Sequence, residues 1–248
     1  LAIDSVEALS EILYILMCGT GVGFSVERQV IAKLPLVPSE PMTGDFEGEW
    51  CVGDSKEGWA EAYQHLLNCL WFENRIPAFD FTQVRPAGAR LKTMGGRASG
   101  PAPLKDLFTY TIKVFEHARG RRLESLELHD LACKIGEIVV VGGVRRSAMI
   151  SLSNLSDDRM REAKSGNWWG SPDDPTSGHK MRAMANNSAV YTEKPDAVIF
   201  MKEWLSLVES NSGERGIINR AAAKRKISLL STTRDPNYDF GLNPCAEI

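Results

Sequence analysis

The stretch Asn243-Pro244-Cys245-Ala246-Glu247-Ile248 is the part of the sequence around which the other segments are organised. It carries an amide, a thiol and a carboxylate at every second position. In an extended or finger-like loop alternate side chains point to the same side, so Asn243, Cys245 and Glu247 share one face. Pro244 fixes its own φ and stiffens the approach. The pattern predicts a loop that presents a reactive sulfur beside a base. A buried structural cysteine near a solvated glutamate is the alternative.

Composition limits the class of protein. The chain has 248 residues, of which 43% are hydrophobic and 25% are charged, as in an ordinary globular protein. Its net charge is −3, from 29 basic and 32 acidic residues, so no basic excess indicates nucleic-acid binding. The longest apolar run, residues 12–18, is too short to span a membrane, and no signal peptide precedes it. We therefore expect a soluble chain that binds neither nucleic acid nor membrane.

The cysteines indicate neither a disulfide scaffold nor a metal site. They are odd in number and widely spaced, and they form no CxxC motif and no cluster with histidine. This usage is typical of a reducing cytoplasm. The five are Cys18, Cys51, Cys69, Cys133 and Cys245.

Helical and strand-like patterns alternate along the chain. Apolar spacing predicts helices over 4–18, 55–73, 104–118, 126–137 and 196–210, and residues 157–164 are expected to form a short polar helix. Alternating or continuous apolar runs predict strands over 24–26, 79–85, 138–141, 144–152, 186–191 and 217–219. Residues 35–54 and 165–180 are expected to be surface loops, and 221–240 a long connection. Short strands separated by helices predict an α/β fold.

Two glycine-rich segments are candidates for ligand contacts. Residues 19–23 are spaced GxGxG and follow a helix, whereas a dinucleotide-binding turn follows a strand and is spaced GxGxxG. Glycine here lets the backbone approach a ligand closely, or simply makes a tight connection. Residues 87–101 contain four glycines and no acid, and with Arg85 they hold four basic side chains. That composition suits a phosphate, and a solvated basic loop is the alternative.

A series of segments in a fixed order resembles one family, the adenosylcobalamin-dependent (class II) ribonucleotide reductases of the monomeric kind. The segments are CGTGVGFSVE at 18–27, RPAGA at 85–89, GGRASGPAPL at 95–104, VRRSA at 144–148, NNS at 186–188 and NPCAE at 243–247. The resemblance covers nearly the whole chain. It implies that residues 1–248 form the first half of a single ten-stranded α/β barrel domain, with a central finger loop and with the C-terminal half of the domain absent.

The resemblance also implies roles for particular residues. Cys245 is the thiyl radical, Glu247 accepts the proton of the ribose 3′-hydroxyl, and Asn243 orients the hydroxyls. Substrate contacts are implied for Thr20, Gly21, Pro244 and Ala246. A specificity loop that couples effector to substrate is implied for Gly95, Gly96, Arg97, Ala98, Ser99 and Gly100.

The reaction implied is reduction of a ribonucleoside triphosphate to a deoxyribonucleotide. The expected cofactor is adenosylcobalamin, the effector a deoxynucleotide and the reductant a thioredoxin-like protein, in the cytoplasm or in the host cytoplasm if the source is viral. The reducing cysteine pair lies outside these residues, so the isolated chain is expected to be inactive. Three alternatives stay open: a class I reductase large subunit, a nucleotide-binding α/β module with an inert Cys245, and an inactive fragment.

Overall fold

The computed structural model describes residues 1–90, 96–141, 148–170, 178–230 and 233–245. Two parallel sheets lie in these residues. The larger holds β1 (Val22–Ser25), β4 (Met149–Asn154), β5 (Ala185–Tyr191) and β6 (Gly216–Asn219) in that order. The smaller pairs β2 (Thr43–Cys51) with β3 (Arg75–Asp80). The predicted α/β class is confirmed, and the described residues do not close a barrel.

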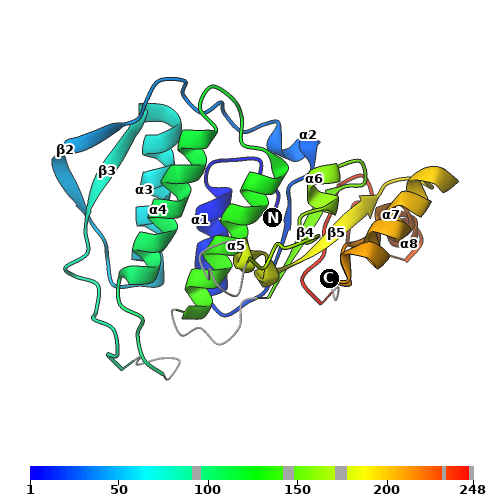
Figure 1. Ribbon diagram of the computed structural model, residues 1–248. Coiled ribbons are helices and arrows are strands. Elements are labelled where there is room, and N and C mark those ends of the chain that lie inside the picture. The colour runs from blue at the N-terminus through cyan, green and yellow to red at the C-terminus, as the bar shows by residue number, and fades with distance from the viewer. Residues whose placement is uncertain (91–95, 142–147, 171–177, 231–232, 246–248) are drawn as a thin grey trace.

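The helices fill the space between the two sheets and cover one end of the larger sheet (Figure 1). They are α1 (Ala8–Met17), α2 (Arg28–Ile31), α3 (Lys56–Asn68), α4 (Ala102–His117), α5 (Ser125–Val141), α6 (Asp158–Arg161), α7 (Ala197–Ser210) and α8 (Arg220–Leu230). A π-helical turn, Cys69–Glu73, extends α3, and a 3-10 turn, Lys180–Met184, precedes β5. Figure 1 shows α3, α4, α1 and α5 between the sheets, with α7 and α8 at the far end.

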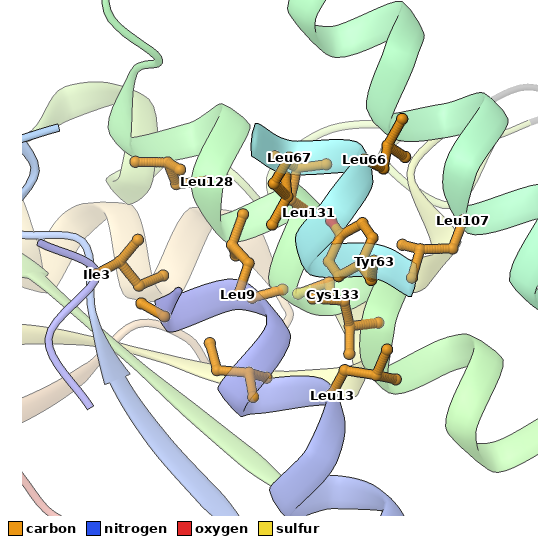
Figure 2. Close-up of a cluster of buried hydrophobic side chains, with 14 of the residues drawn as sticks. Ile3, Leu9, Leu13, Tyr63, Leu66, Leu67, Leu107, Leu128, Leu131 and Cys133 are labelled. Atoms are coloured by element: carbon orange, nitrogen blue, oxygen red, sulfur yellow. The ribbon is translucent and has the colours of Figure 1, made fainter. Parts of the chain in front are cut away.

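The main core forms where α1 packs on α3 and α5. Helix α1 is apolar on most sides, and Leu9 and Leu13 are fully buried. Figure 2 shows these two side chains facing Tyr63 of α3 and residues of α4 and α5. Burying a leucine side chain contributes roughly 1.5–3 kcal/mol relative to exposure. This layer fixes the position of β1, which follows α1 directly.

Capping side chains set where two helices begin. The Ser55 hydroxyl accepts a hydrogen bond from the Gly58 N–H at 2.9 Å, so α3 starts as its sequence predicts. Asp196 accepts one from the Ile199 N–H at 2.9 Å and starts α7. The N-terminal end of α1 differs from its prediction, because the helix begins at Ala8 and Glu7 makes no side-chain cap.

Four predicted segments need correction. Residues 138–141 are not a strand, because α5 continues to Val141 with Ile138 and Val139 packed in the core. The surface loop expected for 35–54 contains β2. The polar sequence of this strand gives no strand signal. The strand expected at 79–85 lies earlier, as β3, and the connection expected at 221–240 begins with α8.

The larger sheet has two different faces. One packs Val22 and Phe24 into the main core. The other carries a small separate cluster in which Ile150, Leu152 and Val190 pack with Ile218. The segment before Cys245 lies against this second face, since a Cβ added to Gly241 would be 3.0 Å from Leu152 Cδ1. The second face is therefore where the candidate site is built.

A buried charge cluster holds α7 against the larger sheet. Arg215 makes two hydrogen bonds to the Glu203 carboxylate, Nη2–Oε1 at 2.8 Å and Nε–Oε2 at 2.9 Å, and Arg161 binds the same carboxylate. Burial raises the pKa of Glu203, but the hydrogen bonds from Arg215 and Arg161 outweigh burial and leave that pKa below its ordinary value.

This cluster predicts acid sensitivity. A carboxyl whose folded pKa is depressed contributes stability above its unfolded pKa of about 4.3, and that stability is lost as pH falls through the folded pKa. Glu203→Gln should lower the melting temperature at pH 7 by about 5–10 °C, because it breaks a buried pair. Melting temperatures followed by circular dichroism between neutral and acid pH should fall less steeply for the variant than for the original protein. Parallel curves would contradict the assignment.

Candidate active site

The segment that leads to Cys245 is seated on the glycine-rich turn after α1. A Cβ added to Gly23 would lie 1.7 Å from the Leu242 carbonyl oxygen, and one added to Gly21 would lie 2.8 Å from Pro244 Cγ. Real Cβ atoms are not found at such distances. Position 23 therefore admits only glycine, whereas a Cβ at position 21 would require the Pro244 ring to shift. The close backbone approach that the GxGxG spacing predicts is made here by the chain's own cysteine loop.

Cys245 directly follows the residues that pack on Gly21 and Gly23. Its side chain is exposed, and it forms no disulfide. Asn243 and Pro244 are partly buried beside it. Cys245 is therefore not buried by the described residues, and its role stays a prediction. Glu247 and Ala246 lie outside the described residues, so the face that Asn243, Cys245 and Glu247 are expected to share stays a prediction.

The turn itself is held by the end of α1. The Thr20 hydroxyl donates to the Ile15 carbonyl at 2.8 Å, and the Gly19 N–H donates to the Leu16 carbonyl at 2.8 Å. Thr20 and Gly21 are exposed. The Thr20 hydroxyl hydrogen is already used in the bond to the helix end. A substrate could therefore contact Thr20 only through its backbone groups or as a donor to its hydroxyl oxygen. The substrate contacts of Thr20, Gly21, Pro244 and Ala246 stay predictions.

A cavity of about 400 Å³ lies beside the cysteine loop. Its walls come from Gly23, Phe24 and Ser25 of β1, from Leu152, from Arg220 at the start of α8, and from residues 239–243. Glu27 and Arg220 form a buried ion pair in this wall. Sequence reasoning missed both residues. Glu27 stands within the FSVE segment, but nothing in the sequence pairs it with an arginine so far along the chain.

Comparison with known proteins gives a consistent result. The chain is 29% identical to the adenosylcobalamin-dependent ribonucleoside-triphosphate reductase of Lacticaseibacillus paracasei, over 94% of this chain and 34% of that protein. It is 26% identical to a putative reductase of the same description from Mycobacterium phage D29, over 94% of this chain and 39% of that protein. The model of the insertion domain of B12-dependent ribonucleotide reductase matches residues 44–115.

Over most of its length the chain is similar to adenosylcobalamin-dependent ribonucleotide reductases. A solved B12-dependent (class II) ribonucleotide reductase shares its fold, with a TM-score of 0.72 and 23% identity over 96% of this chain and 36% of that structure. The chain spans between a third and two fifths of the length of these two curated reductases.

The match to the reductase insertion domain covers the smaller sheet and its helices. Residues 44–115 include β2, α3, β3 and most of α4, which together form the smaller sheet and its helices. Sequence reasoning treated the start of this region as a surface loop. The polar composition of β2 gave no strand signal, and only the βαβ connection through α3 shows that the region is a structural unit.

In the segment expected to be the reductase specificity loop, residues 97–98 pair with residues 88–90 as the two arms of a hairpin. The Gly88 N–H donates to the Ala98 carbonyl at 2.8 Å, and the Ala98 N–H donates to the Ala89 carbonyl at 2.7 Å. Arg97 Nη1 donates to the Gly88 carbonyl at 2.9 Å. Figure 1 shows the described parts of this segment below β3 and α4, away from the C-terminal end of the chain. The described chain therefore does not bring Gly96, Arg97, Ala98, Ser99 and Gly100 to Cys245, and Gly95 lies outside the described residues.

Two absences hold for the described residues. Within them, no group of three or more histidine, cysteine, aspartate or glutamate side chains is placed to hold a metal ion. No helix in the same part of the chain has the length and apolarity needed to cross a membrane.

Proposed function

We propose that this chain is part of the catalytic domain of an adenosylcobalamin-dependent ribonucleoside-triphosphate reductase, and that Cys245 takes a hydrogen atom from the substrate ribose. One observation carries the proposal. The exposed Cys245 thiol ends a loop whose Leu242 backbone lies so close to Gly23 that no side chain is possible there, and whose Pro244 ring packs on Gly21. Collinear similarity to reductases over 94% of the chain supports the same reading.

The chain's own residues divide the chemistry as follows. Cys245, as a thiyl radical, takes the ribose 3′-hydrogen and becomes a thiol. Glu247 accepts the proton of the 3′-hydroxyl as a general base, and Asn243 orients the hydroxyls. The 2′-hydroxyl then leaves as water, and two electrons come from a dithiol, regenerated by a thioredoxin-like protein. Cys245 returns its hydrogen to the 3′ carbon and is again a thiyl.

The cofactor of this proposal is adenosylcobalamin. When bound, it supplies the initial radical by homolysis of its cobalt–carbon bond. The described residues fit that role in one respect, because the Cys245 thiol is exposed and so accessible to a bulky radical source. We assign none of the described residues to the corrin ring.

The proposal extends to the architecture and the partners. Residues 1–248 belong to a single barrel domain. The parallel strands β1, β4, β5 and β6 are successive members of its ten-stranded barrel, and β2 and β3 form a separate sheet. The substrate is a ribonucleoside triphosphate and the effector a deoxynucleotide bound near the 95–100 loop. The protein acts in the cytoplasm, or in the host cytoplasm if it is viral.

The loop proposal makes its own prediction. Gly100 has a φ of +74°, and a Cβ there would lie 2.9 Å from the Ala87 backbone nitrogen. Gly100→Ala should therefore displace the hairpin and change the effector-dependent preference among substrates, measured as product ratios with competing ribonucleotides. Gly166→Ala is the matched control, since Gly166 also has a positive φ but has open space around its Cβ position. An unchanged preference in Gly100→Ala would argue against this loop as the specificity element.

The test of the function uses a full-length protein that contains this chain. A ribonucleoside triphosphate, a dithiol reductant and the protein are incubated with and without adenosylcobalamin, and deoxyribonucleotide is quantified. Product that requires the cofactor supports the proposal. Product that requires a separate radical-generating subunit instead indicates the class I alternative. Nucleotide binding without product in any condition indicates a binding module.

A further inference from the structure

A buried ion pair joins the start of α8 to the end of β1. Arg220 Nη1 donates to Glu27 Oε1 at 2.9 Å and Nη2 donates to Oε2 at 2.7 Å. Both side chains are 2% exposed, and 193 residues separate them. Such a bidentate contact fixes the relative orientation of the guanidinium and the carboxylate as well as the distance between them.

The Glu27 carboxylate is held on its other sides as well. The Ser25 hydroxyl donates to Oε2 at 2.9 Å, and Gln29 Nε2 donates to Oε1 at 3.0 Å. Glu27 follows β1 by two residues, so its carboxylate moves with the strand that contains Gly23. The position of Arg220 is therefore set by the same strand on which the cysteine loop is seated.

Arg220 also donates to the cysteine loop. Its Nε donates to the Phe240 carbonyl at 3.1 Å, five residues before Cys245. One turn further along α8, Lys224 Nζ lies 2.6 Å from Asp239 Oδ1. The loop is thus held at its base by α8, while its tip rests on Gly21 and Gly23.

We propose that the Glu27–Arg220 pair is a positioning device for the reaction: it fixes the base of the loop so that the Cys245 sulfur meets the substrate ribose. The inference rests on the function proposed above. Arg220 acts through the Phe240 carbonyl and is a positioning residue. Hydrogen transfer depends steeply on the distance and angle between the reacting atoms, so a small shift of the loop base lowers turnover.

Arg220→Lys separates this role from simple stabilisation. Lysine keeps the positive charge opposite Glu27, but its single ammonium group cannot reach both carboxylate oxygens and the Phe240 carbonyl in one plane. The matched control is Arg182→Lys. Arg182 is also buried, and its hydrogen bonds go to Asp130, through two nitrogens at 2.7 Å, and to the Ala163 carbonyl rather than to the cysteine loop.

The experiment compares the two variants in the full-length protein at a temperature where circular dichroism shows both folded. Arg220→Lys should lower kcat by about 10- to 100-fold with KM changed by less than about threefold. It should also speed amide hydrogen exchange in residues 237–245. Arg182→Lys should change neither kcat nor that exchange by more than about twofold.

Two results would overturn the inference. One is an Arg220→Lys variant with the turnover and the 237–245 exchange of the original protein. The other is an equal loss in Arg182→Lys, which would reduce the effect to general destabilisation. If the original protein reduces no ribonucleotide, the proposed function fails. The exchange measurement then still decides whether Arg220 holds the loop.

Discussion

Replacing Cys245 by serine in a full-length protein that contains this chain should lower deoxyribonucleotide formation by a factor on the order of 1,000 or more. Serine is close to cysteine in size, so the loop can keep its seat on Gly21 and Gly23. An oxygen–hydrogen bond is much stronger than a sulfur–hydrogen bond, however, and serine cannot form the hydrogen-abstracting radical. Nucleotide binding should stay within about threefold of the original, because Cys245 acts in the chemical step and contributes little to binding.

Reduction and nucleotide binding are measured side by side for this variant and for Cys51→Ser. Cys51 is also exposed, but it lies on β2 in the smaller sheet and has no part in the proposed chemistry. We expect the control to reduce ribonucleotides at the original rate. Unchanged reduction in Cys245→Ser would remove this sulfur from the mechanism, and an equal loss in both variants would indicate a general requirement for thiols.

Gly23→Ala should be the most damaging single-methyl change in the site. Its Cβ would lie 1.7 Å from the Leu242 carbonyl oxygen, so the loop must leave its seat. We expect kcat to fall by about 100-fold, because a displacement near 1 Å at the reacting atom has that effect. Gly21→Ala should lower kcat less than Gly23→Ala does. The atom 2.8 Å from its added Cβ is Pro244 Cγ, which belongs to a ring that can repucker.

Gly53→Ala is the matched control for both glycine changes. Its added Cβ would make an ordinary contact, 3.4 Å from the Gly58 Cα, at the start of α3. Amide hydrogen exchange across residues 241–245 reports the loop position independently of turnover. A Gly23→Ala protein with the original kcat and the original exchange would show that the loop does not depend on this seat.

Local signals predicted much of the fold. Ser55 was identifiable as a helix cap because its hydroxyl precedes a first turn with free N–H groups, and the structure shows that hydrogen bond. The apolar run at 138–141 misled because a buried helix end and a buried strand have the same composition. Strand β2 was missed because its nine residues are mostly polar, glycine or acidic. Its partner β3, not its own sequence, makes it a strand.

The candidate site was predictable in part, for a physical reason. Cys245 and the glycines at 21 and 23 stand out because an unusual thiol loop and an unusual GxGxG spacing are each visible locally. Their contact is not visible, since it joins segments more than 200 residues apart in the chain. The Glu27–Arg220 pair is also not visible in the sequence, because nothing near either residue distinguishes it from an ordinary charged surface residue. The role of Glu247 stays a prediction from the motif.

The most direct test of the account uses a substrate deuterated at the ribose 3′ carbon. Single-turnover reduction of this substrate by the full-length protein is compared with that of the unlabelled substrate and of one deuterated at the 5′ carbon. If Cys245 takes the 3′-hydrogen, the 3′ label alone should slow reduction severalfold, and Cys245→Ser should show no turnover of any of the three. Equal rates for the 3′-labelled and unlabelled substrates, together with reduction by Cys245→Ser, would contradict the account.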